Sequence, residues 1–198
     1  AGKFEQFVTY TYTGEAATLV FTLAGNTYMP YFFAEACDIT PCEVIFKDQN
    51  GTELGRIETY EGATLAEIPY TEANLPAIEE GSKFRGWYYN SGKKVTVGDV
   101  INGNTTIQAL VTPIETATVG SVQTYPLNNS IFYPEDHETI EIAGGSFHDG
   151  THGWHFAANG TIKVQVAGNA VVVVTMCTYS ESGEVVVTDA AGVELGRD

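Results

Sequence analysis

Four short segments within residues 42–111 decide the fold of the central part of this chain. In chain order they read VIFKDQNGTELG (44–55), YEGATL (60–65), FRGWYYNSGKKV (84–95) and TTIQALV (105–111). The first is an alternating strand that ends at Asn50-Gly51, a dipeptide typical of hairpin turns. The second contains a turn at Gly62, the third is an aromatic strand, and the fourth is another alternating strand. The pattern predicts a small β module.

In this order and at this spacing, the four segments resemble the Listeria-Bacteroides repeat, a β-grasp-like spacer module of bacterial surface proteins. The resemblance implies one domain over residues 40–115 with Trp87 in its core. It also implies one short helix, for which weak helical spacing appears at 65–68 and around 73–78. A chain with such a spacer is expected to belong to a longer secreted or cell-surface protein, and its activity is expected in the flanking sequence.

Composition and charge exclude several function classes. The 198 residues are 43% hydrophobic, which is enough for one or two ordinary cores. No apolar run approaches the roughly 20 residues that span a bilayer, so we expect no membrane insertion. Nine Lys and Arg against 25 Asp and Glu give a net charge of −16. This charge repels phosphate backbones, so we expect no nucleic-acid partner.

The flanking sequence is also patterned as β-structure. Segments rich in Val, Thr, Tyr and Phe are separated by turn residues and read FEQFVTYTYT, ATLVFTLAG, TIKVQVAG, AVVVVTMCTYS and EVVVTDA. Residues 1–38 alone are too few to bury a stable core and need a partner. The predicted fold class is therefore mainly β: a β-sandwich split between the two chain ends, with a small β-grasp-like domain inserted.

A second resemblance concerns the two chain ends. Residues 146–192 and 7–36 look like the front and back halves of a β-sandwich module that accompanies bacterial pectate lyases and other polysaccharide-degrading enzymes. In this chain the halves occur in reversed order, with the spacer between them. The resemblance implies that residues 1–38 and 117–198 form one carbohydrate-binding-like module.

The reversed order permits two arrangements. The ends of one chain can fold together into a single sandwich, since chain termini often lie close together. Alternatively, each half pairs with a neighbouring copy, which would produce a fibre or a swapped dimer. For the isolated chain we favour the first arrangement, because closing a loop across an ordered insert costs little additional entropy.

The segment FHDGTHGWHF (147–156) contains three of the four histidines. A metal site could use His148 and His152 with His155 or Asp149. In an extended strand, however, His155 points away from the face that His152 and Trp154 share, so we expect no metal site. As a sugar site, the Trp154 ring would stack beside His152 and Asp149. The alternative is that Trp154 is a core aromatic residue and His152 a buried residue bonded to backbone.

Two further aromatic residues are candidate sugar contacts. Tyr31 and Tyr133 adjoin prolines in irregular stretches, where recognition residues concentrate. The other aromatic residues of the flanking sequence are expected to be core more often than binding platform.

No catalytic or cofactor motif stands out. The chain has no GxSxG elbow, no HExxH and no phosphate-binding glycine loop, so we expect neither an enzyme nor a cofactor. The acidic pairs 79–80 and 135–136 are expected to be solvated. Cys37 and Cys42 could form a small disulfide, or all three cysteines could be free thiols.

These observations favour a non-catalytic extracellular carbohydrate-binding module with its spacer. The alternative is a structural or adhesive stalk that associates with neighbouring copies. Residues 1–38 and 117–198 together hold 3 basic and 14 acidic residues, which would repel free polygalacturonate unless calcium bridges the carboxylates. The expected partner is therefore a neutral or esterified plant glycan.

Overall fold

The computed structural model describes residue 20, residue 22, residues 38–176 and residues 184–197. It confirms the predicted mainly-β class, with several sheets of sandwich-like character. Most of the proposed N-terminal half-module, including Tyr31, lies outside the described residues, so its pairing with residues 117–198 stays a prediction. Within the part of the chain that the structure describes, no helix has the length and apolar character that crossing a membrane requires.

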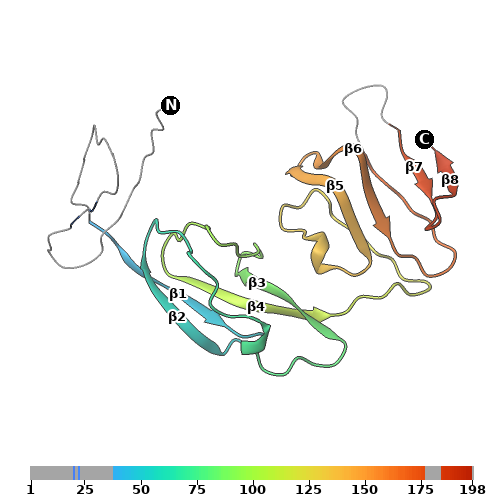
Figure 1. Ribbon diagram of the computed structural model, residues 1–198. Helices are drawn as coiled ribbons and strands as arrows, with labels where there is room; N and C mark the ends of the chain where they lie inside the picture. Colours follow the sequence, from blue (N-terminus) through green and yellow to red (C-terminus); the bar gives the residue numbers. More distant parts are fainter. Residues whose placement is uncertain (1–19, 21, 23–37, 177–183, 198) are drawn as a thin grey trace, which may run out of the picture. The chain divides into compact units, whose positions relative to one another are not determined.

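The central module is a mixed four-stranded sheet (Figure 1). Its strands are β1 (Pro41–Lys47), β2 (Glu53–Tyr60), β3 (Ser82–Tyr89) and β4 (Thr105–Pro113), in the spatial order β2-β1-β4-β3. Strand β1 pairs with β2 in antiparallel orientation and with β4 in parallel orientation. The sheet therefore has a parallel pair in its centre and one further strand on each side, and its assignment to the Listeria-Bacteroides repeat stays a prediction.

Alternation along the strands builds the core of this sheet. Val44 and Phe46 on β1 and Ile107 on β4 are fully buried. The Phe46 ring meets the Trp87 ring edge-on, with centroids 5.7 Å apart. Trp87 is 5% exposed, and its indole Nε1 donates to the Tyr70 carbonyl at 2.9 Å. The prediction that Trp87 is a core residue is confirmed, so we assign it no binding role.

The predicted hairpin turn at Asn50-Gly51 is also confirmed. Asp48 Oδ1 accepts the backbone N–H of Asn50 at 2.8 Å and that of Thr52 at 2.9 Å. Gly51 has φ +84°, a left-handed conformation that glycine adopts without strain. The carboxylate therefore closes the turn between β1 and β2.

The expected short helix is reduced to a single 3-10 turn, η1 (Glu72–Asn74). Pro76 explains why the turn does not continue. Proline has no N–H to donate, and it disfavours helical geometry at the preceding residue, Leu75, which is extended at φ −83° and ψ 153°.

The remaining elements follow the central sheet in sequence. They are η2 (Pro134–Asp136), the antiparallel pair β5 (Ile140–Asp149) and β6 (Gly153–Val164), and the antiparallel pair β7 (Val186–Thr188) and β8 (Glu194–Arg197). Two compact units are distinguishable. One includes residues 38–76, 87–91 and 95–109; the other includes 77–86, 92–94, 110–176 and 184–197.

Within the second unit, a buried ion pair joins β3 to the segment before β5. The Arg85 side chain is 1% exposed, and its guanidinium donates to both carboxylate oxygens of Glu138. Arg85 also donates to Thr112 Oγ1 at 2.9 Å. Residue 85 lies inside the expected 40–115 domain and residue 138 lies outside it. That the 40–115 domain folds independently therefore stays a prediction, and any such fragment would lose this ion pair.

One expected strand is missing from the described part of the flanking sequence. The run AVVVVTM (170–176) was expected to be a strand but has no regular structure. Its valines are exposed, from 56% at Val174 to 91% at Val171. A strand needs hydrogen-bonding neighbours, and the described residues supply none for this run.

Candidate functional site

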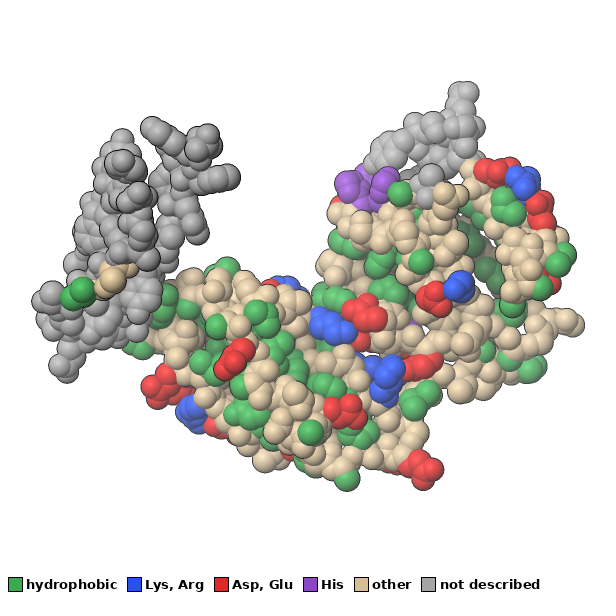
Figure 2. Space-filling view, viewed as in Figure 1, with side chains coloured by type: hydrophobic (Ala, Val, Ile, Leu, Met, Phe, Trp, Pro, Cys, Tyr) green, Lys and Arg blue, Asp and Glu red, His purple; other side chains and the backbone are tan. Residues whose placement is uncertain are grey.

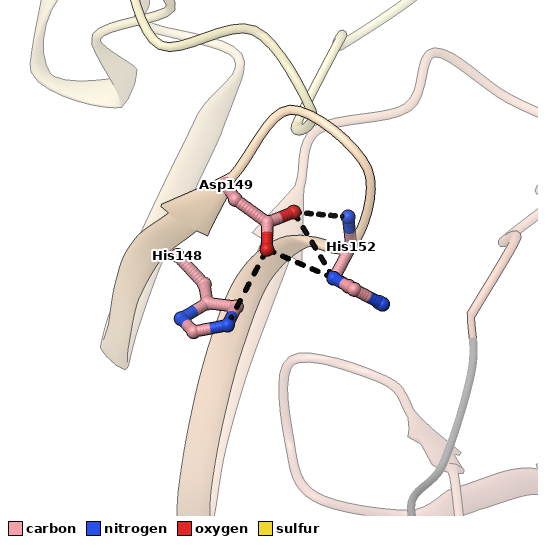
Figure 3. Close-up of side chains that lie close together, drawn as sticks. All are labelled: His148, Asp149 and His152. Carbon is pink, nitrogen blue, oxygen red and sulfur yellow. Dashed lines mark hydrogen bonds and ion pairs between the residues drawn. The ribbon is translucent and has the colours of Figure 1, made fainter.

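The candidate site is the turn that joins β5 to β6 (Figure 3). Its shape comes from a β-bulge in the register of the two strands. Phe147 pairs with Trp154, and Asp149 pairs with Gly153, so His148 is the extra residue between two registered pairs. A bulge redirects the side chain of its extra residue. Here it leaves the His148 ring beside the Asp149 carboxylate, with 3.4 Å between Nε2 and Oδ2.

Asp149 organises the turn. Its Oδ1 accepts the backbone N–H groups of Thr151 at 2.8 Å and His152 at 2.7 Å. The His152 ring approaches the same carboxylate, with Nδ1 2.9 Å from Oδ2. These bonds favour the ionised carboxylate. The His152 ring, followed by the two backbone donors, lowers the pKa of Asp149 from 3.8 to about 2.

The cluster of His148, Asp149 and His152 is open to solvent. The side chains are 56%, 42% and 42% exposed, respectively. Histidine side chains are visible at the surface over this end of the β5–β6 hairpin (Figure 2). The two imidazole centroids are 6.0 Å apart. The expected alternative of a buried His152 is therefore wrong, because the turn holds the ring at the surface.

Trp154 lies half-buried on the face of the hairpin that also holds Phe147 and Phe156. Its indole Nε1 is buried and has no hydrogen-bond partner among the described residues. The ring is thus neither a fully buried core residue nor an exposed platform. An unpaired donor of this kind is uncommon in folded proteins and calls for an explanation.

His155 does not join the cluster. It pairs with Ser146 across the hairpin and is exposed. The prediction that one metal ion could not gather all three histidines is consistent with this position, because the group of potential ligands contains His148 and His152 but not His155.

Tyr133 is occupied by contacts with Lys94. Its hydroxyl oxygen accepts the Lys94 backbone N–H at 2.9 Å, and the Lys94 ammonium lies 5.5 Å from the ring centroid. The same ammonium contacts Asp136 at 2.6 Å and Glu135 at 3.2 Å. The expectation of a solvated pair holds for Glu135, whose side chain is 61% exposed, but is wrong for Asp136, whose side chain is 13% exposed against the Lys94 ammonium. Tyr133 is half-buried and is a weaker candidate for ligand contact than the turn residues.

The sugar site predicted from the sequence does not include His148, although the structure places it in the cluster. Its place depends on the bulge, and strand alternation alone does not reveal a bulge. The sequence signal that comes closest to predicting this arrangement is the run Asp149-Gly150-Thr151-His152-Gly153, which is rich in turn residues.

Comparison of the chain with protein-family models, with curated proteins and with solved structures finds no match.

Proposed function

We propose that this chain is a non-catalytic extracellular carbohydrate-binding module joined to a β-grasp-like spacer of the Listeria-Bacteroides type. The observation that carries the proposal is the β5–β6 turn. It holds the polar groups of Asp149 and His152 at the surface. His152 precedes by two residues the half-buried Trp154, whose indole Nε1 has no hydrogen-bond partner among the described residues. An aromatic ring that is partly exposed near surface polar groups supports binding of a pyranose, which has apolar faces and a hydroxylated rim.

The charge of the chain narrows the ligand class. Nine basic residues against 25 acidic ones disfavour a polyanionic glycan. We therefore propose a neutral or esterified plant polysaccharide as the partner. A calcium-bridged acidic glycan would require carboxylates on both sides of the ion.

Retention of the full chain in gels that contain polysaccharide tests this proposal. We expect retention by neutral or esterified plant glycans and not by free polygalacturonate. The variant Trp154→Ala should bind roughly 5- to 100-fold more weakly, in line with other aromatic anchors. The control His155→Ala, on the same strand but outside the cluster, should bind as the wild type does.

Circular dichroism must accompany each binding measurement, because loss of a half-buried ring can also unfold the module. The proposal fails if folded wild-type protein is retained by none of the neutral and charged polysaccharides, with and without calcium. It also fails if Trp154→Ala stays folded and binds normally.

A second candidate function is a structural or adhesive stalk that associates through exchanged half-modules. The exposed apolar side chains of the C-terminal region favour it. They include Val171, Val172, Val173 and Val174, which are 56–91% exposed, and Leu195, which is 68% exposed. A run of four consecutive exposed valines is typical of a segment that another part of the chain or another molecule covers.

A further inference from the structure

The β5–β6 turn brings together three side chains of types that ligate metal ions, and this grouping does not depend on glycan binding. We propose that His148, Asp149 and His152 bind one divalent transition-metal ion of the zinc or copper class. Each histidine would supply one imidazole nitrogen and Asp149 one carboxylate oxygen. The remaining coordination positions would be open to solvent or to an oxygen of a ligand.

The distances within the cluster support this proposal. One ligand atom from each of the three side chains lies within 4.8 Å of the others. Tetrahedral zinc with bonds of about 2.0 to 2.2 Å places its ligand atoms roughly 3.3 to 3.5 Å apart. His148 Nε2 is already 3.4 Å from Asp149 Oδ2, whereas His152 Nδ1 is 2.9 Å from it. The imidazole nitrogens lie within 4.8 Å of each other, so the two exposed rings would have to turn toward one ion to complete the geometry.

The turn also prepares the carboxylate for coordination. Asp149 Oδ1 is held by two backbone N–H groups, and both histidine rings converge on Oδ2 (Figure 3). A ligating carboxylate that is itself hydrogen-bonded is typical of protein metal sites. The bulge at His148 and the turn at Gly153 are therefore the elements that bring the three ligands together.

The kinds of ligand atom indicate which metal would bind. Two imidazoles and one carboxylate suit zinc, copper or nickel, whereas calcium and magnesium prefer sets of oxygen ligands. The excess of acidic residues, with a net charge of −16, favours the approach of any cation. The nitrogen ligands, and not this charge, would supply the selectivity.

The test uses the full chain and Zn²⁺ alone. Isothermal titration calorimetry of the wild type should show one Zn²⁺ bound per chain. The variant His148→Ala should bind at least tenfold more weakly, and so should His152→Ala. His148→Ala is the more informative of the two, because His152 and Asp149 also hold the turn together. The matched control His155→Ala removes an exposed histidine of the same hairpin and should bind Zn²⁺ as the wild type does.

A second readout identifies the ligands directly. The electron paramagnetic resonance spectrum of bound Cu²⁺ should show hyperfine splitting from two nitrogens in the wild type and from one nitrogen in His148→Ala. The proposal is overturned if the wild type binds no Zn²⁺. It is also overturned if His148→Ala binds Zn²⁺ as well as the wild type, or if His155→Ala loses as much affinity as His148→Ala. None of these results depends on whether the chain binds a glycan.

Discussion

At the scale of single residues, Arg85 brings a permanent charge into the interior of the protein. Its side chain is 1% exposed, and Glu138 is the carboxylate that compensates the charge. Lys83 at 3.3 Å and the Glu115 backbone N–H at 3.1 Å add further bonds to this carboxylate. A buried pair adds little relative to apolar residues, but removing one partner leaves an uncompensated charge.

We therefore expect Glu138→Gln to lower the free energy of unfolding by roughly 2 to 3 kcal/mol. This is slightly below the usual cost of breaking a buried ion pair, because the Glu138 side chain is still 24% exposed. The matched control is Glu141→Gln. It breaks a pair with Lys163 in which both side chains are more than 60% exposed, and should cost less than about 1 kcal/mol. Chemical denaturation measures both; equal losses would contradict the assigned role of Glu138.

The same carboxylate predicts a pH dependence of stability. The bond from Arg85 is the main cause that lowers the pKa of Glu138 from 4.5 to about 2. A lowered folded-state pKa means that the contribution is fully present above pH 4.5 and is lost as pH falls through 2. The stability difference between wild type and Glu138→Gln should therefore shrink over this range. A difference that stays constant down to pH 2 in denaturation curves would refute the prediction.

At the scale of elements, the β5–β6 turn depends on Gly153. Its φ is +78°, and a Cβ atom there would lie 3.0 Å from the Leu127 carbonyl oxygen. Gly153→Ala should therefore lower the free energy of unfolding by about 1 to 3 kcal/mol and displace the turn. Gly196→Ala is the control, because a Cβ at Gly196 meets no atom within 4 Å and the backbone there is not left-handed. Thermal unfolding distinguishes them; a tolerated alanine at 153 would count against this account of the turn.

Elements whose signals are local were predictable from the sequence. The Asn50-Gly51 turn follows from turn chemistry, and the burial of Val44, Phe46 and Trp87 follows from strand alternation and the module's pattern. The bulge at His148 was not predictable, because it depends on how two strands register rather than on either strand alone. Asp149 and His152 were predicted as site residues from the sequence. The position of His148 beside them was not predicted, because it depends on this bulge.

The predictions of a helix around 73–78 and of a strand at 170–176 were wrong for a different reason. At 73–78, the propensity signal was weak and Pro76 overrode it. At 170–176, propensity alone does not make a strand, since strands require neighbours with which to pair. Local propensity therefore indicates which segments favour β-structure, but it does not decide which of them pair with another strand.

At the scale of the whole molecule, the exposed valines raise the question of what covers them. Val173 and Val119 are both 84% exposed, but only Val173 lies in the run that was expected to be a strand of the split sandwich. If residues 1–38 complete that sandwich, Val173→Asp should destabilise the full chain by about 1 to 3 kcal/mol, the usual worth of a buried valine. Val119→Asp should be nearly neutral. Equal effects in chemical denaturation would leave the split-sandwich hypothesis without support.

The assembly of the chain separates the two candidate functions. We expect the full chain to be a monomer by light scattering at all accessible concentrations, because both halves of the proposed sandwich belong to one molecule. Removal of residues 1–38 should leave the valine run without the segment that is proposed to cover it, so the shortened chain should associate as its concentration rises. If instead the mass and the thermal stability of the full chain both increase with concentration, folding and association are linked, and the stalk function replaces the monomeric binding module. If the shortened chain is also a stable monomer, residues 1–38 are not the missing half of the sandwich.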